Sequence, residues 1–302
     1  MKAKILMVTA SNDLTCDYLI TKFPEAPFFR LNVDLFSTYA IGVTAEGFSI
    51  ANEFSSIDSQ TCKSIYYRKP VPENLEGVLD QEYHAFAHKE AYSLVEGIVE
   101  SFDGQCLSKP SIMRRANNKV VQLALARRLG FRVPDATITN AGSLVEKAAY
   151  DVGIVKPLSV GTVMHDGVKE FVQTNIIDES IDKYSLKYAP AYFQEFIDKD
   201  FELRVTFVGR NAYTVRIDSR NKVDWRKSNN EIQYSTAKLP NDLHERCVAF
   251  MGALNMNFGC FDFMIKDGYH YFLEMNANGQ WAWLEKELGI EISKGLMEFL
   301  NG

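Results

Sequence analysis

The chain has 302 residues, a formal net charge of −6, 46% hydrophobic residues and 24% charged residues. This composition indicates a globular protein long enough for two domains, and its acidic balance argues against nucleic acid or an anionic membrane as a partner. The five cysteines are scattered without a Cys-x-x-Cys pair, and no apolar run has the length of a signal peptide core or a membrane span. We therefore expect a cytoplasmic protein.

Residues 1–109 are expected to form an N-terminal α/β domain. A strand is predicted at residues 4–9, followed by a helix over residues 12–22 with Ser11 or Asn12 as its N-cap. Further short strands are predicted at residues 28–31, 39–43, 48–52 and 64–67. A long amphipathic helix over residues 80–101 completes this domain, and Pro110 marks its end.

Residues 110–302 are expected to form a second domain of the same α/β class, with a central lobe (110–193) and a C-terminal lobe (194–302). In the central lobe, helices are predicted at residues 117–129 and 143–150, and strands at residues 136–139, 153–156, 168–172 and 192–196. In the C-terminal lobe, the sequence predicts hairpins of 202–208 with 212–217 and of 258–265 with 269–275, and helices at 239–254 and 291–300.

The last predicted hairpin carries one carboxylate on each of two apolar strands, Asp262 and Glu274. If a three-residue loop joins the strands and Lys266 faces His270, the register places Asp262 opposite Glu274. Two like charges so placed are costly unless a cation lies between them, so these carboxylates and the Asn276 amide oxygen predict a magnesium site. Loss of either carboxylate should then slightly stabilise the metal-free protein. The alternative is an exposed strand face with incidental acids.

Lys156 ends an apolar strand and is followed by a loop of small residues, 157–162. An ammonium group beside free backbone N–H groups can hold a polyphosphate. The segment lacks the Gly-x-x-x-x-Gly-Lys-[Ser/Thr] pattern, so it is not a Walker loop, and a plain surface turn is the alternative.

The segment 192–205 is a second candidate for nucleotide contact. Its strand ends at Glu195, and a bend leads to Glu202 and Arg204. This pattern can offer adenine a backbone edge, ribose a carboxylate and a phosphate a bidentate guanidinium. Arg226, in a polar segment, is another candidate arginine. The alternatives are a surface hairpin for the segment and a solvated loop for Arg226.

Other motifs favour no function. His84 and His88 stand four residues apart, but Ala85 replaces the glutamate of the zinc-protease pattern. The basic doublets Arg114-Arg115 and Arg127-Arg128 lie among helix formers without interleaved aromatic residues, which is typical of a solvated helix surface.

Taken together, these segments resemble the ATP-grasp superfamily, and within it the ligases that mature microviridin-type ribosomal peptides, also called graspetides. The motifs behind the closer resemblance are Phe29-Arg30-Leu31-Asn32-Val33-Asp34, Tyr66-Tyr67-Arg68-Lys69-Pro70, Asn117-Asn118-Lys119 through Gln122-Leu123, Glu202-Leu203-Arg204, Asp224-Trp225-Arg226 and Leu273-Glu274-Met275-Asn276-Ala277-Asn278-Gly279-Gln280-Trp281. The resemblance spans nearly the whole chain. Lys69, Met275 and Ala277 depart from the usual pattern, which concerns peptide selectivity more than ATP chemistry.

The resemblance implies a three-lobed ATP-grasp fold that grips ATP between two α+β lobes, with Mg²⁺ as the metal. It implies phosphate contacts from Lys119 and Lys156, an adenine hinge of Gln194, Glu195 and Ile197, metal ligands Asp262, Glu274 and Asn276, and phosphoryl-facing arginines Arg204 and Arg226. Glu202 stays the candidate for the ribose.

The implied reaction activates an Asp or Glu side chain of a ribosomal precursor peptide, made of a leader and a core, as an acyl phosphate. A Ser or Thr hydroxyl or a Lys amine of the same peptide then closes an ester or amide ring. A ligase of the same fold that adds free amino acids, and a non-catalytic ATP-binding regulator, are the alternatives. A homodimer is left open.

Overall fold

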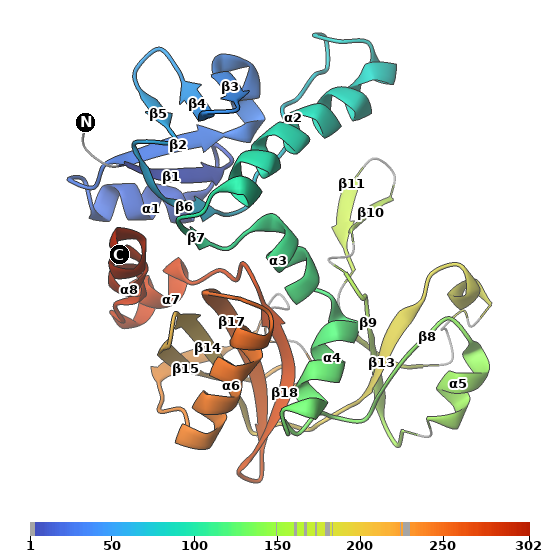
Figure 1. Cartoon of the computed structure of the whole chain (residues 1–302). Coiled ribbons are helices and arrows are strands. Elements are labelled where there is room, and N and C mark those ends of the chain that lie inside the picture. The colour runs from blue at the N-terminus through green and yellow to red at the C-terminus, as the bar shows by residue number, and fades with distance from the viewer. Residues whose placement is uncertain are drawn as a thin grey trace.

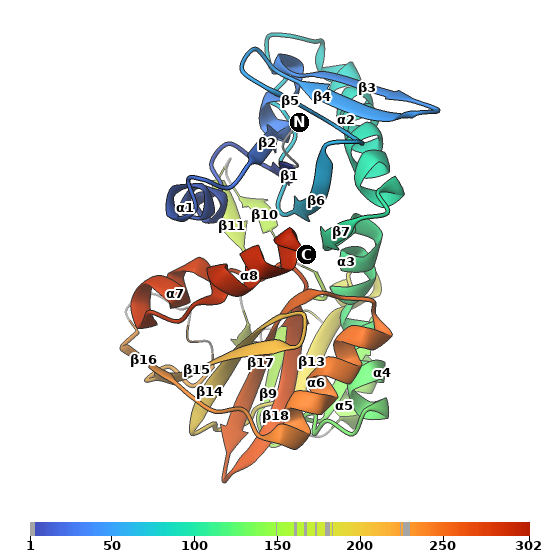
Figure 2. The ribbon, with the colours of Figure 1, turned by 60° about the vertical axis from the view of Figure 1, so that its left-hand side comes forward.

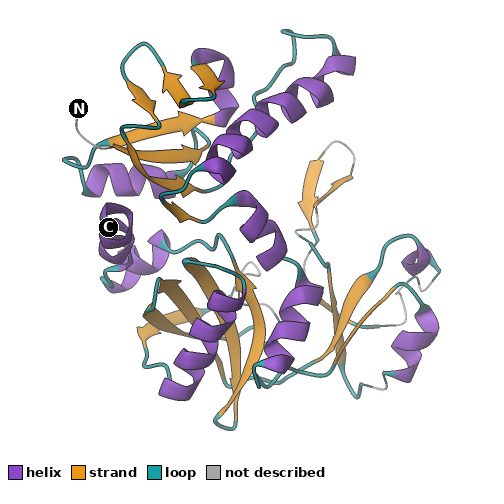
Figure 3. Cartoon of the chain, viewed as in Figure 1, coloured by secondary structure: helices purple, strands orange, loops and turns teal. Residues whose placement is uncertain are grey.

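The structure is a computed structural model that describes residues 4–148, 150–159, 162–165, 168–172, 174–178, 182, 184–223, 225 and 230–302. Figures 1 and 3 show its helices and sheets. The helices are α1 Leu14–Lys22, α2 Gln81–Ser101, α3 Pro110–Ala116, α4 Lys119–Arg128, α5 Gly142–Lys147, α6 Asn241–Ala253, α7 Ala282–Leu288 and α8 Ile292–Asn301, with short 3-10 helices η1 Val33–Thr38 and η2 Ser185–Lys187.

The strands fall into five sheets. The parallel sheet β2-β1-β6-β7 and the small sheet β3-β4-β5 come from the first part of the chain, the sheet β12-β9-β13-β8 and the hairpin β10-β11 from the middle, and the sheet β16-β15-β14-β17-β18 from the last part. The strand bounds are β1 Lys4–Thr9, β2 Phe28–Asn32, β3 Ala40–Thr44, β4 Gly47–Ala51, β5 Ser56–Asp58, β6 Cys62–Tyr67, β7 Gln105–Leu107, β8 Ala136–Thr139, β9 Gly153–Lys156, β10 Thr162–His165, β11 Val168–Phe171, β12 Asn175–Ile176, β13 Ala191–Glu195, β14 Phe201–Val208, β15 Asn211–Ser219, β16 Ile232–Thr236, β17 Phe258–Lys266 and β18 Tyr269–Asn276.

The parallel sheet is buried on both faces, which explains the uninterrupted apolar run of β1. Leu6 and Val8 belong to one core cluster, and Ile5 and Met7 to the other. The predicted strand is confirmed, but the predicted helix cap is wrong. Asp13 is the N-cap of α1, because its carboxylate accepts hydrogen bonds from the Thr15 and Cys16 amides.

The C-terminal sheet is antiparallel, and its side chains alternate between two faces. Leu203, Val205 and Phe207 of β14 face the apolar side chains of α6, such as Phe250. The opposite face holds Arg204 in mid-strand. α8 contacts β14, β6 and β7, so it lies between this sheet and the N-terminal sheet, as Figure 2 shows.

The predicted hairpin of β17 and β18 forms, but its turn differs from the expectation. Lys266 pairs with Tyr269, so the loop is the two-residue turn Asp267–Gly268. Both turn residues have positive φ, 49° and 77°, as the tight two-residue turns of hairpins require. An irregularity between Asp262 and Phe263 then shifts the register by one residue and restores the expected pairing of Asp262 with Glu274.

Several short elements were not predicted: η1, β5, β7, α3, β10, β12, η2, β16 and α7. Pro110, expected to end the N-terminal domain, is the first residue of α3, where its missing N–H costs no hydrogen bond. The division at residue 109 and the lobe limits stay predictions. Among the described residues, no helix has the length and apolar character needed to cross a bilayer.

Candidate active site

The site is built around a row of charged side chains across three neighbouring strands. Arg204 of β14 pairs with Asp262 of β17, which pairs with Glu274 of β18. Arg204 Nη1 donates to both carboxylate oxygens of Asp262, at 2.9 and 2.8 Å. Both side chains are only 6% exposed, so this is a buried ion pair, and it holds the pKa of Arg204 above its ordinary value despite burial.

Asn276 and Lys119 complete the row. Asn276 Nδ2 lies 3.0 Å from Asp262 Oδ2 and 3.2 Å from Glu274 Oε1, so its amide bridges the two carboxylates. Lys119 Nζ, at the start of α4, donates to Glu274 Oε2 at 2.7 Å. Each carboxylate therefore has its own cation, which offsets the repulsion expected from the sequence.

Lys156 is the last residue of β9, in the sheet β12-β9-β13-β8. Its Nζ donates to Gln194 Oε1 at 3.0 Å and lies 4.4 Å from the centre of the Tyr192 ring. Burial, and then the nearby Lys119 ammonium, lower the pKa of Lys156 to about 8, while the Glu274 carboxylate opposes the shift. Two lysines and one carboxylate thus meet where the two sheets face each other.

The expected adenine and ribose contacts lie at the end of β13 and the start of β14. The Glu195 amide donates to the Asp135 carbonyl at 2.8 Å, and the Ile197 carbonyl accepts from the Lys199 amide at 2.8 Å. These two backbone groups already have partners. Glu202 is buried and forms an ion pair with Lys199, three residues earlier in the chain.

Two side chains outside the predicted set hold the strand that bears Glu274 and Asn276. Gln122, buried on α4, accepts from the Met275 amide at 2.9 Å and donates to the Met275 carbonyl at 2.8 Å. Asn117 Oδ1 accepts from the Ala277 amide at 3.1 Å. The motif from Asn117 through Leu123 includes both residues, but a bond across more than 150 residues has no local signal.

The donor set fits a magnesium ion shared with phosphate. The described residues contain no group of three His, Cys, Asp or Glu side chains that could hold a metal. The row instead offers two carboxylates and one amide, and Mg²⁺ needs only a few protein oxygens when phosphates supply others. Rotation of the Asn276 amide would present its oxygen in place of Nδ2. Arg204 Nε is buried and meets no acceptor in the described part of the chain, which suits an anionic ligand.

His84, His88 and the basic doublets take no part in the row. Arg226 lies outside the described residues, as do residues 160 and 161 of the predicted phosphate loop. His84 and His88 bond to the Leu79 and Glu73 carbonyls. The four arginines of the basic doublets are exposed, as predicted.

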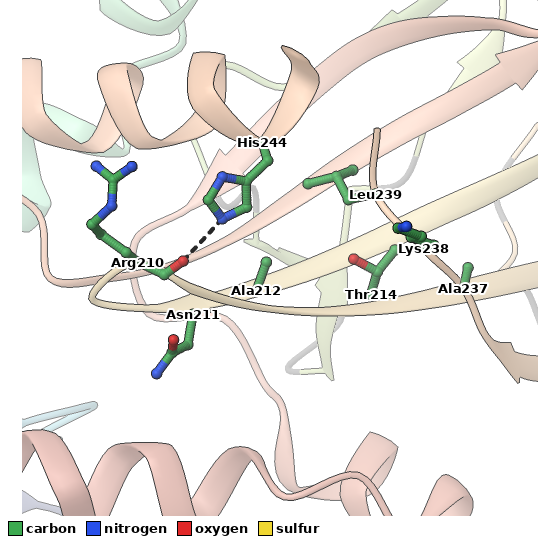
Figure 4. Close-up of a pocket in the computed structure, with 8 residues that line it drawn as sticks. All are labelled: Arg210, Asn211, Ala212, Thr214, Ala237, Lys238, Leu239 and His244. Carbon is green, nitrogen blue, oxygen red and sulfur yellow. Dashed lines mark hydrogen bonds between the residues drawn. The ribbon is translucent and has the colours of Figure 1, made fainter. Parts of the chain in front are cut away.

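A separate hollow beside the β14–β15 turn is shown in Figure 4. His244 Nε2 donates to the Arg210 carbonyl there at 3.0 Å, and the Arg210 guanidinium bonds to Glu245. Its side chains do not include any of the row described above.

The family model of the MvdD pre-ATP grasp domain matches residues 4–114. A ligase structure from Chryseobacterium gregarium, described as a RiPP-associated ATP-grasp ligase in complex with ADP and a leader and core peptide, is 26% identical with a TM-score of 0.89; the alignment covers 99% of this chain and 96% of that one. Over nearly its whole length the chain is thus similar to RiPP-associated ATP-grasp ligases, and its first part matches their pre-ATP grasp domain.

Two further similar structures come from Microcystis aeruginosa MRC. The macrocyclase MdnC, bound with precursor peptide MdnA, is 25% identical with a TM-score of 0.87, over 98% of this chain and 99% of that chain. The macrocyclase MdnB is 26% identical with a TM-score of 0.80, over 99% of both chains. No curated protein sequence matches the chain.

Proposed function

We propose that this ATP-dependent ligase is a peptide macrocyclase, which joins Asp or Glu side chains of a ribosomal precursor peptide to Ser or Thr hydroxyls or Lys amines of the same peptide. The observation that carries the proposal is the row Arg204–Asp262–Glu274, flanked by Lys119 and Lys156. Its support from similar structures is the full-length similarity to one ligase solved with ADP and a leader and core peptide, and to one macrocyclase bound with a precursor peptide.

Each residue of the row has a role in this proposal. Asp262, Glu274 and Asn276 would hold Mg²⁺, which supplies positive charge beside the phosphates. Lys119 and Lys156 bind the phosphates already present in the ground state. Other nucleotide contacts come from Gln194, Glu195 and Ile197 at the adenine and Glu202 at the ribose, and the arginines facing the transferred group are Arg204 and Arg226.

The proposed reaction has two steps. An oxygen of the peptide carboxylate forms a bond to the γ-phosphorus while the bond to ADP breaks, which gives an acyl phosphate. The hydroxyl or amine of the peptide then attacks the acyl carbon, loses its proton, and phosphate leaves. Arg204 offers its unpartnered Nε–H to the phosphoryl oxygens, where charge grows in the transition state.

The five cysteines are buried free thiols. Because the cytoplasm keeps thiols reduced and supplies ATP, we place the reaction there. A precursor peptide is the partner in this proposal, and a homodimer stays a prediction.

The test uses a candidate precursor peptide, sought among the reading frames next to the gene as a short sequence with repeated Thr and Asp or Glu residues near its end. Incubation with ATP and Mg²⁺ should lower the peptide mass by one water for each bond, and mild base should restore that mass only for esters. Glu274→Gln, a substitution at a partly exposed position, should form no product. A mass gain equal to an added amino acid would instead support the alternative ligase.

A further inference from the structure

Arg68 is a fully buried arginine that none of the roles above uses. Its side chain is 0% exposed, and its Nε donates to Asp13 Oδ2 at 2.7 Å. Nη2 donates to Thr15 Oγ1 at 2.9 Å and to Gln280 Oε1 at 2.7 Å. Nη1 lies 3.4 Å from Asn278 Oδ1, and the amide of Asn278 donates back to the Arg68 carbonyl.

These bonds join two parts of the chain that are distant in sequence. Asp13 and Thr15 belong to the turn after β1 and to the start of α1. Gln280 and Asn278 lie in the segment 276–281. This segment starts at the last residue of β18, the candidate metal ligand Asn276. A planar guanidinium with five donors is the side chain best suited to hold several acceptors in fixed directions at once.

The same segment touches Arg204. Arg204 Nη2 donates to the Gln280 carbonyl at 3.2 Å. Gly279 packs so closely that a Cβ there would lie 2.8 Å from Arg204 Nη2. A continuous series of bonds therefore runs from Asp13 through Arg68 and Gln280 to Arg204, and from Arg204 to Asp262.

We propose that Arg68 is a positioning residue: by fixing the segment 276–281, it sets the orientation of Arg204 toward the transferred phosphoryl group. The role of Arg204 in this statement rests on the proposed function. The N-terminal domain then contributes to catalysis through an arginine that touches neither nucleotide nor metal. A misplacement of about 1 Å at a reacting group can cost on the order of a hundredfold in rate, so a small shift of the segment matters.

A second buried bridge between the same parts of the molecule provides the control. Glu285 of α7 accepts from Tyr18 Oη of α1 at 2.8 Å, forms an ion pair with Lys22, and accepts from the Ser293 amide at 2.6 Å. This bridge also ties α1 to the C-terminal helices, but these bonds do not involve the segment 276–281. Its loss should loosen α7 and α8 without moving Arg204.

The experiment compares Arg68→Lys and Gln280→Ala with Gln280→Glu and the control Glu285→Gln. Gln280 is exposed, so its substitutions keep the protein folded even if Arg68→Lys does not. Hydrogen exchange is measured for the segment 276–281, together with the affinity for MgADP and the kcat and KM for ATP.

Arg68→Lys and Gln280→Ala should each speed exchange in the segment 276–281 and lower kcat by about tenfold or more, a larger change than in KM for ATP or in MgADP affinity. Gln280→Glu keeps an acceptor for Arg68 and should stay near wild type. Unchanged exchange in Arg68→Lys and Gln280→Ala, or the same loss of kcat in Glu285→Gln, would overturn the inference. If the wild-type enzyme does not turn over ATP, the proposed function fails, and the exchange comparison still tests the bridge.

Discussion

At the residue scale, Gly279 shows how tightly Arg204 is enclosed. A Cβ at this position would lie 2.6 Å from Cys260 Cβ as well as 2.8 Å from Arg204 Nη2. Since Cys260 and Arg204 belong to adjacent strands of one sheet, neither can move far without disturbing the row of charges. The absence of a side chain at residue 279 is therefore a requirement of the site.

Gly279→Ala should lower kcat by about tenfold or more and destabilise the protein by about 1–3 kcal/mol, because the added methyl group overpacks the space beside Arg204. The matched control is Gly252→Ala in α6, where a Cβ would meet nothing within 4 Å. That change should raise stability by roughly 0.5–1 kcal/mol, because alanine favours a helix. Steady-state kinetics and urea unfolding measure both, and an active Gly279→Ala enzyme would contradict this packing.

The ion pair of Arg204 with Asp262 reverses the stability expectation drawn from the sequence. Asp262→Ala leaves a buried guanidinium without its carboxylate, so the metal-free protein should lose about 3–5 kcal/mol. Glu274→Gln should lose only about 1 kcal/mol, because Glu274 and Lys119 are 25% and 17% exposed and the amide still offers an acceptor. Urea unfolding without nucleotide or magnesium gives both values. An Asp262→Ala protein as stable as wild type would instead support the expectation from the sequence that Asp262 and Glu274 repel each other.

At the element scale, the hairpin of β17 and β18 shows both the reach and the limit of sequence reasoning. The pairing of Asp262 with Glu274 could be predicted, because each is a lone carboxylate on one of two apolar strands that flank the same turn. The length of the turn could not be predicted. The expected loop was one residue longer than the observed one, and the register shift between Asp262 and Phe263 compensates for that one residue. The irregularity leaves Leu273 of β18 without a partner in the register, and no turn residue in the local sequence marks that position.

Lys156, at the end of β9, leads to a prediction about the pH dependence of nucleotide binding. A pKa of about 8 means that the Lys156 ammonium loses its proton above that pH, whereas a phosphate ligand needs the charged form. MgADP affinity should therefore be constant below pH 8 and fall by up to about tenfold per pH unit above it. Lys156→Arg keeps its charge throughout this range and should abolish the dependence. A wild-type affinity that stays constant up to pH 9.5 would contradict the assignment of Lys156 to the phosphates.

At the scale of the whole molecule, the site depends on contacts between distant segments. Most long helices and strands followed from local patterns, as at β1, β8 and β9, whose bounds agree with the expectation. Two of the bonds that hold the site residues did not follow from local patterns. Arg204 and Asp262 are 58 positions apart, and Arg68 and Gln280 are 212 apart, so only the assembled fold shows that they meet. The residue types were readable, but these two long-range pairings were not.

The central claim is that ATP activates a peptide side chain as an acyl phosphate. The most direct measurement uses a precursor peptide whose Asp and Glu side-chain carboxylates carry ¹⁸O. If the claim is correct, one labelled oxygen passes into the released phosphate for each ester or amide bond formed, because the carboxylate oxygen that attacks the γ-phosphorus leaves with it. Bond formation that releases only unlabelled phosphate would contradict the claim, since the carboxylate would then never have been bonded to phosphorus.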